Sequence, residues 1–172
     1  MTDHSSSEQA FERTPLLAFS LSTCLQIQFL REIATDIRTL TSSAVRTDGP
    51  WDGNALAKAQ GLFWLWILGA YEMVRTMAQA KQCFAPDALQ RIVQEKKHLA
   101  QIRMPFAKQE REGKRLPVWR EFFSDGCNAD GDIIFTIAGN TVHAKVQLVR
   151  FEAFVTGFEC ADILMSHEQS YL

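Results

Sequence analysis

Arg91 and His98 are the two side chains in this 172-residue chain whose types and spacing best suit chemistry. Seven positions on a helix make nearly two full turns, so both side chains point the same way, with Glu95 between them. An arginine neutralises a phosphate, and a histidine moves a proton near neutral pH. The pair therefore has the chemistry to bind a phosphate and to transfer a proton. The alternative is a solvated helix face on which Arg91 pairs with Glu95.

An Arg and a His separated by four to six residues are similar to the signature of HEPN ribonucleases, small helical bundles that often dimerise. The resemblance implies that Arg91 and His98 act on RNA together with the same pair of a second subunit. It covers these two positions only, and Ile92 stands where the family often has a polar residue. A HEPN-like ribonuclease or RNA-binding bundle is therefore the alternative functional hypothesis.

A second polar group surrounds the end of the most apolar stretch of the chain. Should the helices that contain Glu72 and Arg103 pack antiparallel, the carboxylate would meet a cation and form one side of an anion or ligand pocket. The alternative is a structural ion pair that closes the edge of the core. The residues assigned to this pocket are Tyr71, Glu72, Arg75, Arg103 and Lys108.

Charge is divided unevenly along the second half of the chain. Residues 96–120 contain eight basic and two acidic residues, whereas residues 121–172 contain two basic and eight acidic residues. A basic helix end binds phosphates, or it pairs with an acidic segment of the same chain or of a neighbour. We favour pairing, because no aromatic residues suited to base stacking interleave the basic run. Nucleic acid is a possible partner that we do not favour.

The sequence predicts no metal site and no cofactor. The four histidines and four cysteines lie too far apart for the paired ligands of zinc sites. The loop Asn128–Asp132 lacks the first and twelfth ligands of a calcium loop and is interpreted as a turn. Widely spaced cysteines are typical of reduced thiols, so we expect a cytoplasmic protein.

Four helices and a hairpin must position these side chains. Apolar spacing predicts a first helix at 16–44, with a break near 20–23, and a second at 55–82 with Asn54 as its cap. The second contains an unbroken apolar run at 61–71, which is about half of what a membrane span needs. We expect that run to be buried on all sides.

The third helix is predicted to start at Pro86, to kink at Pro105 and to end at Gly113. A short helix or turn follows at 118–123, then a loop at 124–132. A β-hairpin is expected at 133–143, with its first strand at 133–137. Residues 144–150 fit either a continued strand or a helix, and the longer pattern favours a last helix at 144–165.

These elements indicate a mainly α protein, with three long helices, a C-terminal helix and a small β-hairpin. Residues 1–14 are interpreted as a flexible tail and residues 15–172 as a single helical domain. For function we expect a non-enzymatic cytoplasmic protein that acts through self-association or protein binding, without membrane insertion. The hypothesis depends on the complementary charge halves, a free pairing edge at 133–137 and the lack of a catalytic constellation.

Overall fold

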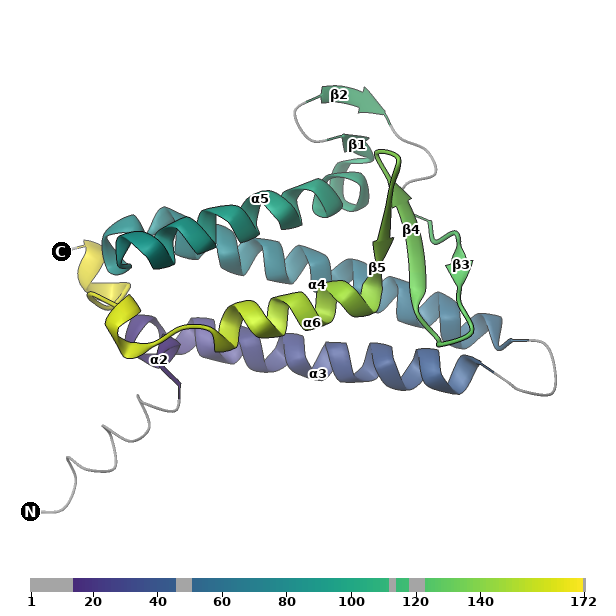
Figure 1. The fold of residues 1–172 in the computed structure, drawn as a ribbon, viewed down its shortest axis with the longest axis horizontal. Coiled ribbons are helices and arrows are strands. Elements are labelled where there is room, and N and C mark those ends of the chain that lie inside the picture. Colours follow the sequence, from purple (N-terminus) through teal and green to yellow (C-terminus); the bar gives the residue numbers. More distant parts are fainter. Residues whose placement is uncertain (1–13, 46–50, 112–113, 118–122, 172) are drawn as a thin grey trace, which may run out of the picture.

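The computed structural model describes residues 14–45, 51–111, 114–117 and 123–171. Its long helices are α3 (Leu21–Ala44), α4 (Gly53–Gln79), α5 (Pro86–Lys108) and α6 (Ala144–Thr156), and one turn, α2 (Leu16–Phe19), precedes them. Figure 1 shows α6 in front, α4 behind, and α3 and α5 on either side. The mainly helical prediction is confirmed. The predicted tail lies outside the described residues except for Thr14.

Polar side chains and proline set the helix starts. Ser20 adopts an extended backbone and accepts a hydrogen bond from the Thr23 amide at 3.3 Å, so α2 and α3 separate where the break was predicted. Asp52, rather than the predicted Asn54, caps α4 by accepting from the amides of residues 54 and 55. Pro86 occupies the first turn of α5, where its missing N–H costs nothing.

The predicted end of the third helix is wrong. Helix α5 passes through Pro105 but ends at Lys108, because Gln109 turns into the left-handed region with φ 54°. A two-stranded ladder of β1 (Glu110–Arg111) and β2 (Lys114–Pro117) replaces the expected helical continuation. Gly113 lies outside the described residues, as does the expected short element at 118–123 apart from Phe123.

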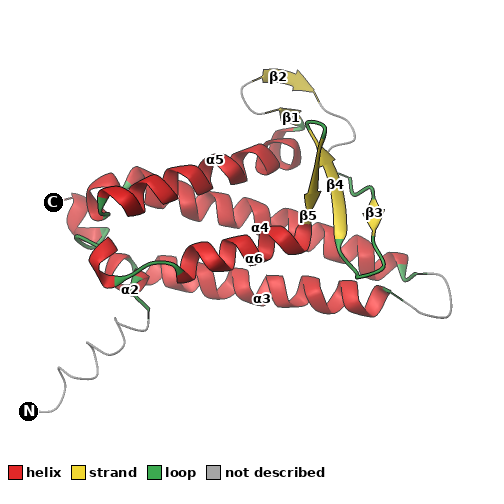
Figure 2. Cartoon of the chain, in the orientation of Figure 1, coloured by secondary structure: helices red, strands yellow, loops and turns green. Residues whose placement is uncertain are grey.

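The predicted hairpin forms, with β4 (Ile133–Ile137) and β5 (Asn140–His143) antiparallel. Ala138 and Gly139 both have positive φ, as two-residue hairpin turns require. The sequence missed β3 (Gly126–Cys127), which pairs with the first half of β4 inside the expected loop. Since β4 is the central strand, one of its edges is used by β5 and the first two residues of the other edge by β3. Figure 2 shows the strands at one end of the bundle.

Helix α6 starts where it was predicted and ends earlier. The Asp132 carboxylate caps it by accepting from the Lys145 amide at 2.9 Å, so residues 144–150 are helical. The helix stops at Gly157, whereas the prediction continued to residue 165. Beyond it, residues 160–167 form a C-terminal strap. The strap donates from the Leu164 amide to the Cys83 carbonyl and from the His167 amide to the Phe19 carbonyl.

The core lies between α6 and the other helices, but it covers only one side of α4. Trp66 is 1% exposed; its ring lies 5.2 Å from that of Phe151, and its indole N–H donates to the Leu30 carbonyl. Its neighbours Trp64 and Leu65 are 47% and 57% exposed. The expectation that residues 61–71 are buried on all sides is therefore wrong. No helix within the described ranges is long and apolar enough to cross a membrane.

Candidate functional site

Arg91 joins α5 to the segment that follows α6. Its guanidinium donates to the Asp162 carboxylate at 2.6 Å and to the Gly157 carbonyl at 3.4 Å. The same group lies over the Phe158 ring, 5.4 Å from the ring centroid. These contacts occupy the cation on two sides. In this arrangement Arg91 links α5 to the segment after α6, while its side chain stays 45% exposed.

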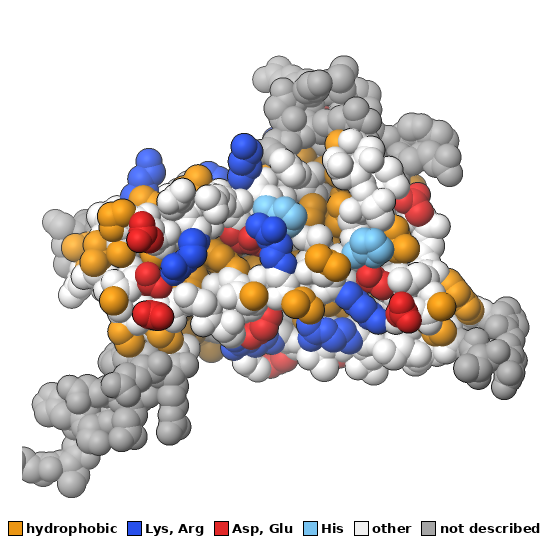
Figure 3. Space-filling view, in the orientation of Figure 1, with side chains coloured by type: hydrophobic (Ala, Val, Ile, Leu, Met, Phe, Trp, Pro, Cys, Tyr) orange, Lys and Arg blue, Asp and Glu red, His pale blue; other side chains and the backbone are white. Residues whose placement is uncertain are grey.

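Glu95 and His98 continue the same line of contacts toward the other end of α6. Glu95 is buried and accepts from Arg150 Nε at 2.8 Å, so the expected Arg91–Glu95 pair does not form. His98 Nε2 lies 2.6 Å from the side-chain oxygen of the buried Gln147. We call Arg91, Glu95 and His98 of α5, together with their partners Asp162, Arg150 and Gln147, the α5–α6 seam. Figure 3 shows basic, acidic and histidine side chains side by side on this face.

The second predicted cluster forms in part. Helices α4 and α5 bring Glu72 within 2.6 Å of Arg75 and 3.6 Å of Arg103, as antiparallel packing implied. The Arg103 guanidinium lies 5.0 Å from the centroid of the Tyr71 ring. Lys108 has no recorded contact with this group in the described part of the chain. The arrangement is an ion-pair cluster at the edge of the core, in which the Glu72 carboxylate hydrogen-bonds to Arg75 but not to Arg103.

The uneven charge is not neutralised by pairing within the protomer as described. The cross-element ion pairs are Arg31–Glu152, Arg91–Asp162, Glu95–Arg150, Glu72–Arg103 and Asp132–His143. Among the described side chains, none of them joins a base of residues 96–110 to an acid of residues 123–169. The predicted pairing of the basic segment with the acidic end of the same chain is therefore not seen for the described bases of residues 96–110.

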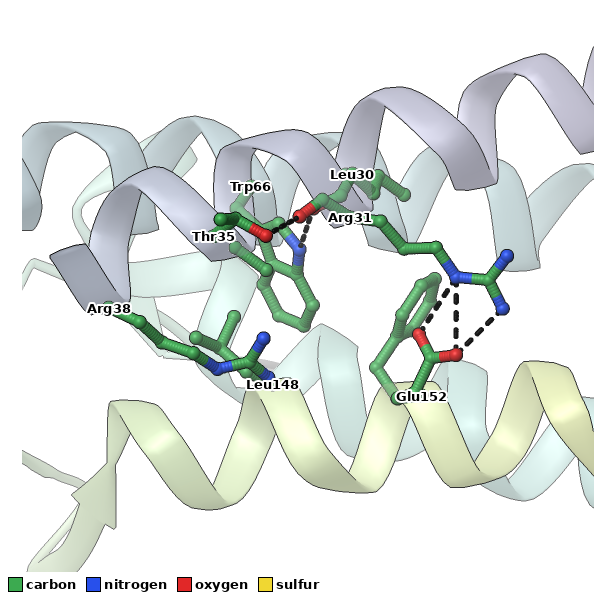
Figure 4. A pocket seen from close by; sticks show the side chains of 9 residues that line it. Leu30, Arg31, Thr35, Arg38, Trp66, Leu148 and Glu152 are labelled. Atoms are coloured by element: carbon green, nitrogen blue, oxygen red, sulfur yellow. Dashed lines mark hydrogen bonds and ion pairs between the residues drawn. The ribbon is translucent and has the colours of Figure 1, made fainter.

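A groove of about 230 Å³ runs between α3 and α6. Figure 4 shows Arg31 and Arg38 at its two ends, with Trp66 and Leu148 between them. Arg31 forms a bidentate ion pair with Glu152, in which Nη2 lies 2.7 Å from Oε1. Arg38 has no recorded partner among the described side chains. Such a groove can accept one carboxylate or phosphate beside Arg38. Its carboxylate, Glu152, is held by Arg31, and its hydroxyl, Thr35, donates to the Arg31 carbonyl.

Two cysteines are poorly suited to act as nucleophiles. Burial raises the pKa of the Cys24 thiol, and the nearby Arg31 offsets this only in part. Burial, together with the charge of Asp132, also raises the pKa of Cys127. Both thiols therefore stay protonated at neutral pH, which is the unreactive form.

The sequence missed the surface that the structure leaves open, the outer face of α4. It is turned away from α6, and its members are each exposed or half-buried: Lys58, Gly61, Leu62, Trp64, Leu65, Leu68, Gly69 and Glu72. Phe29 of α3, 60% exposed, directly precedes Leu30, which lies against Gly69. The signal was present as the apolar run itself, but we assigned that run wholly to the core.

The apolar character of this face extends toward α5. A hollow of about 440 Å³ is lined by Ala57, Gly61, Trp64, Phe106 and Phe123, together with the amides of Gln60 and Gln109. Contiguous exposed apolar surface on a folded protein marks an interaction site or a binding groove. The outer face of α4 is therefore the part of the described structure best suited to bind something.

Comparisons with known proteins identify no function for this surface. The chain matches no family model, and neither a curated protein nor a solved structure is similar to it. Within the described residues, no three His, Cys, Asp or Glu side chains are placed to hold a metal ion.

Proposed function

We propose that this protein acts in the cytoplasm as a non-enzymatic association module, and that it binds protein through the outer face of α4. The observation that carries the proposal is the exposure of Trp64 and Leu65, at 47% and 57%, in the middle of the most apolar helix. Covering large apolar side chains releases about 25 cal/mol for each Å² removed from water. The helix keeps them at the surface of the described structure, where a binding partner can cover them.

The polar residues support the same proposal. In the α5–α6 seam, the arginines, the carboxylate of Glu95 and the histidine contact other side chains of the same protomer. Such pairing is typical of polar groups with a structural role. A catalytic site instead needs such groups directed at an open space. The cytoplasmic setting rests on the widely spaced cysteines of the sequence.

A dye that fluoresces on apolar surfaces tests the proposal without a known partner. At sub-micromolar protein concentration, we expect Leu65→Asp to bind less anilinonaphthalene sulfonate than the native chain. Val149 is the matched control, since it is 62% exposed and belongs to α6, which lies in front of the core in Figure 1 whereas α4 lies behind it. Val149→Asp should bind dye as the native chain does. Equal dye binding by both variants would contradict the proposal, provided that both melt at the native temperature.

A further inference from the structure

We propose that the partner of the outer face of α4 is a second copy of this chain, and that the two α4 helices pack antiparallel about a two-fold axis beside Leu65. This inference rests on the association function proposed above. It adds the identity and the orientation of the partner.

The outer face of α4 reads the same in both directions from Leu65. Leu62 and Leu68 stand three positions away on either side, and Gly61 and Gly69 stand four positions away. In an antiparallel pair with two-fold symmetry, each position meets the position at the same distance on the other side of the centre. Leucine therefore meets leucine, glycine meets glycine, and the two copies of Leu65 meet at the axis.

No close contact among the described residues explains Gly61. A Cβ built at this position would meet nothing within 4 Å. Glycine is an unfavourable residue inside a helix, so an open site should favour alanine. Gly69 differs, because its Cβ would lie 3.2 Å from Leu30 Cδ2. Leu30 therefore accounts for Gly69 within the protomer. A facing backbone accounts for Gly61, since two helices approach more closely where side chains are absent.

Opposite charges stand at equal distances from the same centre. Lys58 lies seven positions before Leu65 and has no recorded partner in the described part of the protomer; Glu72 lies seven positions after it. Arg75 holds one carboxylate oxygen of Glu72 at 2.6 Å, and the other oxygen lies 3.6 Å from Arg103, beyond hydrogen-bond distance. The antiparallel pair brings Lys58 of each copy to this second oxygen of the other copy.

The same charges select the antiparallel orientation. A parallel pair in register would place Lys58 beside Lys58 and Glu72 beside Glu72, which is destabilising. The antiparallel pair forms two opposite-charge contacts instead, one at each end of the apolar centre. The sheet offers a weaker route to a dimer, because β4 already pairs on both sides.

Cross-linking tests the position of the axis. We expect Leu65→Cys to form a disulfide-linked dimer under mild oxidation, because the two Cβ atoms of residue 65 meet at the axis. Val149→Cys, with comparable exposure on α6, and the native chain with its own cysteines are the controls. Both controls should stay at the monomer position on a non-reducing gel. Cross-linking of all three proteins to the same extent, or of none, would overturn this axis.

A double-mutant cycle tests the orientation. Positions 58 and 72 are 14 residues apart, or about 21 Å along one helix, which exceeds the screening length at physiological salt. We expect Lys58→Glu to weaken dimerisation at least about tenfold, and a further Glu72→Gln to restore most of that loss. Such coupling requires two copies, because within one copy the residues are too far apart. Strictly additive effects on the dimer dissociation constant would overturn the antiparallel pairing.

These results separate the dimer from the association function. Light scattering should show a dimer for the native chain and a monomer for Leu65→Asp. If the native chain is a monomer and its dye binding still depends on Leu65, the dimer proposal is overturned, whereas the proposed association surface is supported. A native dimer that Leu65→Asp does not dissociate would overturn this interface. Dye binding that is independent of Leu65 would overturn the proposed function itself.

Discussion

The α5–α6 seam and the outer face of α4 are opposite in chemistry and in use. The seam consists of charged and amide side chains of the kind that perform chemistry, and each of them contacts a partner within the chain. Between Lys58 and Glu72, the outer face consists of tryptophan, leucine and glycine, the residues of a core, and it faces water. The comparison teaches that residue type alone does not locate the binding surface that we propose. The polar side chains of the seam pair within the chain, although one oxygen of the buried Glu95 keeps no hydrogen-bond partner among the described residues. The exposed apolar side chains carry the function that we propose.

Trp66→Ala and Leu65→Ala compare the two sides of α4 at adjacent positions. Trp66→Ala should lower the free energy of unfolding by about 3 to 5 kcal/mol, because it leaves a cavity and removes a buried hydrogen bond. Leu65→Ala should change it by no more than about 0.5 kcal/mol when the protein is dilute. Urea unfolding at low protein concentration measures both. Similar losses at the two positions would remove the distinction between an inner and an outer side.

Arg91→Ala and His98→Ala test the seam. Each should lower the free energy of unfolding by about 1 kcal/mol, the first by losing Asp162 and the Phe158 ring, the second by leaving the buried Gln147 amide unpaired. Urea unfolding and cleavage of a single-stranded RNA are the measurements. The ribonuclease hypothesis prevails if the native chain cleaves RNA and both variants lose that activity without loss of stability.

Gly61→Ala should separate protomer stability from association. The added methyl group points into open space, so it should stabilise the dilute protomer by about 0.5 to 1 kcal/mol through helix propensity. The same methyl group should weaken the dimer, because it lies where two backbones meet. Thermal unfolding and sedimentation equilibrium report the two effects. A variant that is both more stable and equally dimeric would show that Gly61 has no part in the interface.

The sequence predicted the helices well because their apolar stripes repeat every three or four residues, and it predicted the hairpin from a β-branched run and a turn. The helix ends were harder. Residues 107–112 have good helix propensity, yet Gln109 adopts the left-handed conformation and a strand follows. Beyond Gly157, Phe158 continued the apolar spacing, but the chain folds back to meet α5. In both places a tertiary contact or turn overrides a local preference.

The candidate site divides in the same way. The contact between Glu72 and Arg103 was predictable, because antiparallel helices bring those positions together. The partners of Arg91 and His98 were not, because they lie 71 and 49 residues further along the chain. The exposed side of α4 was hidden for another reason. A helix that is apolar all round has no polar face to reveal which side meets water, so composition cannot distinguish a core from an interface between chains.

The C-terminal strap has a consequence for how this protein is made. Arg91 contacts Gly157 and Asp162, and the Phe19 carbonyl accepts from His167. Gly157 and the strap are thus synthesised after the elements that they hold in place. A nascent chain that has reached only α5 therefore lacks α6 over its core and presents the inner side of α4 as well as the outer one. Closure requires that residues 157–167 have emerged from the ribosome, and until then the growing chain exposes the apolar surface that chaperones bind.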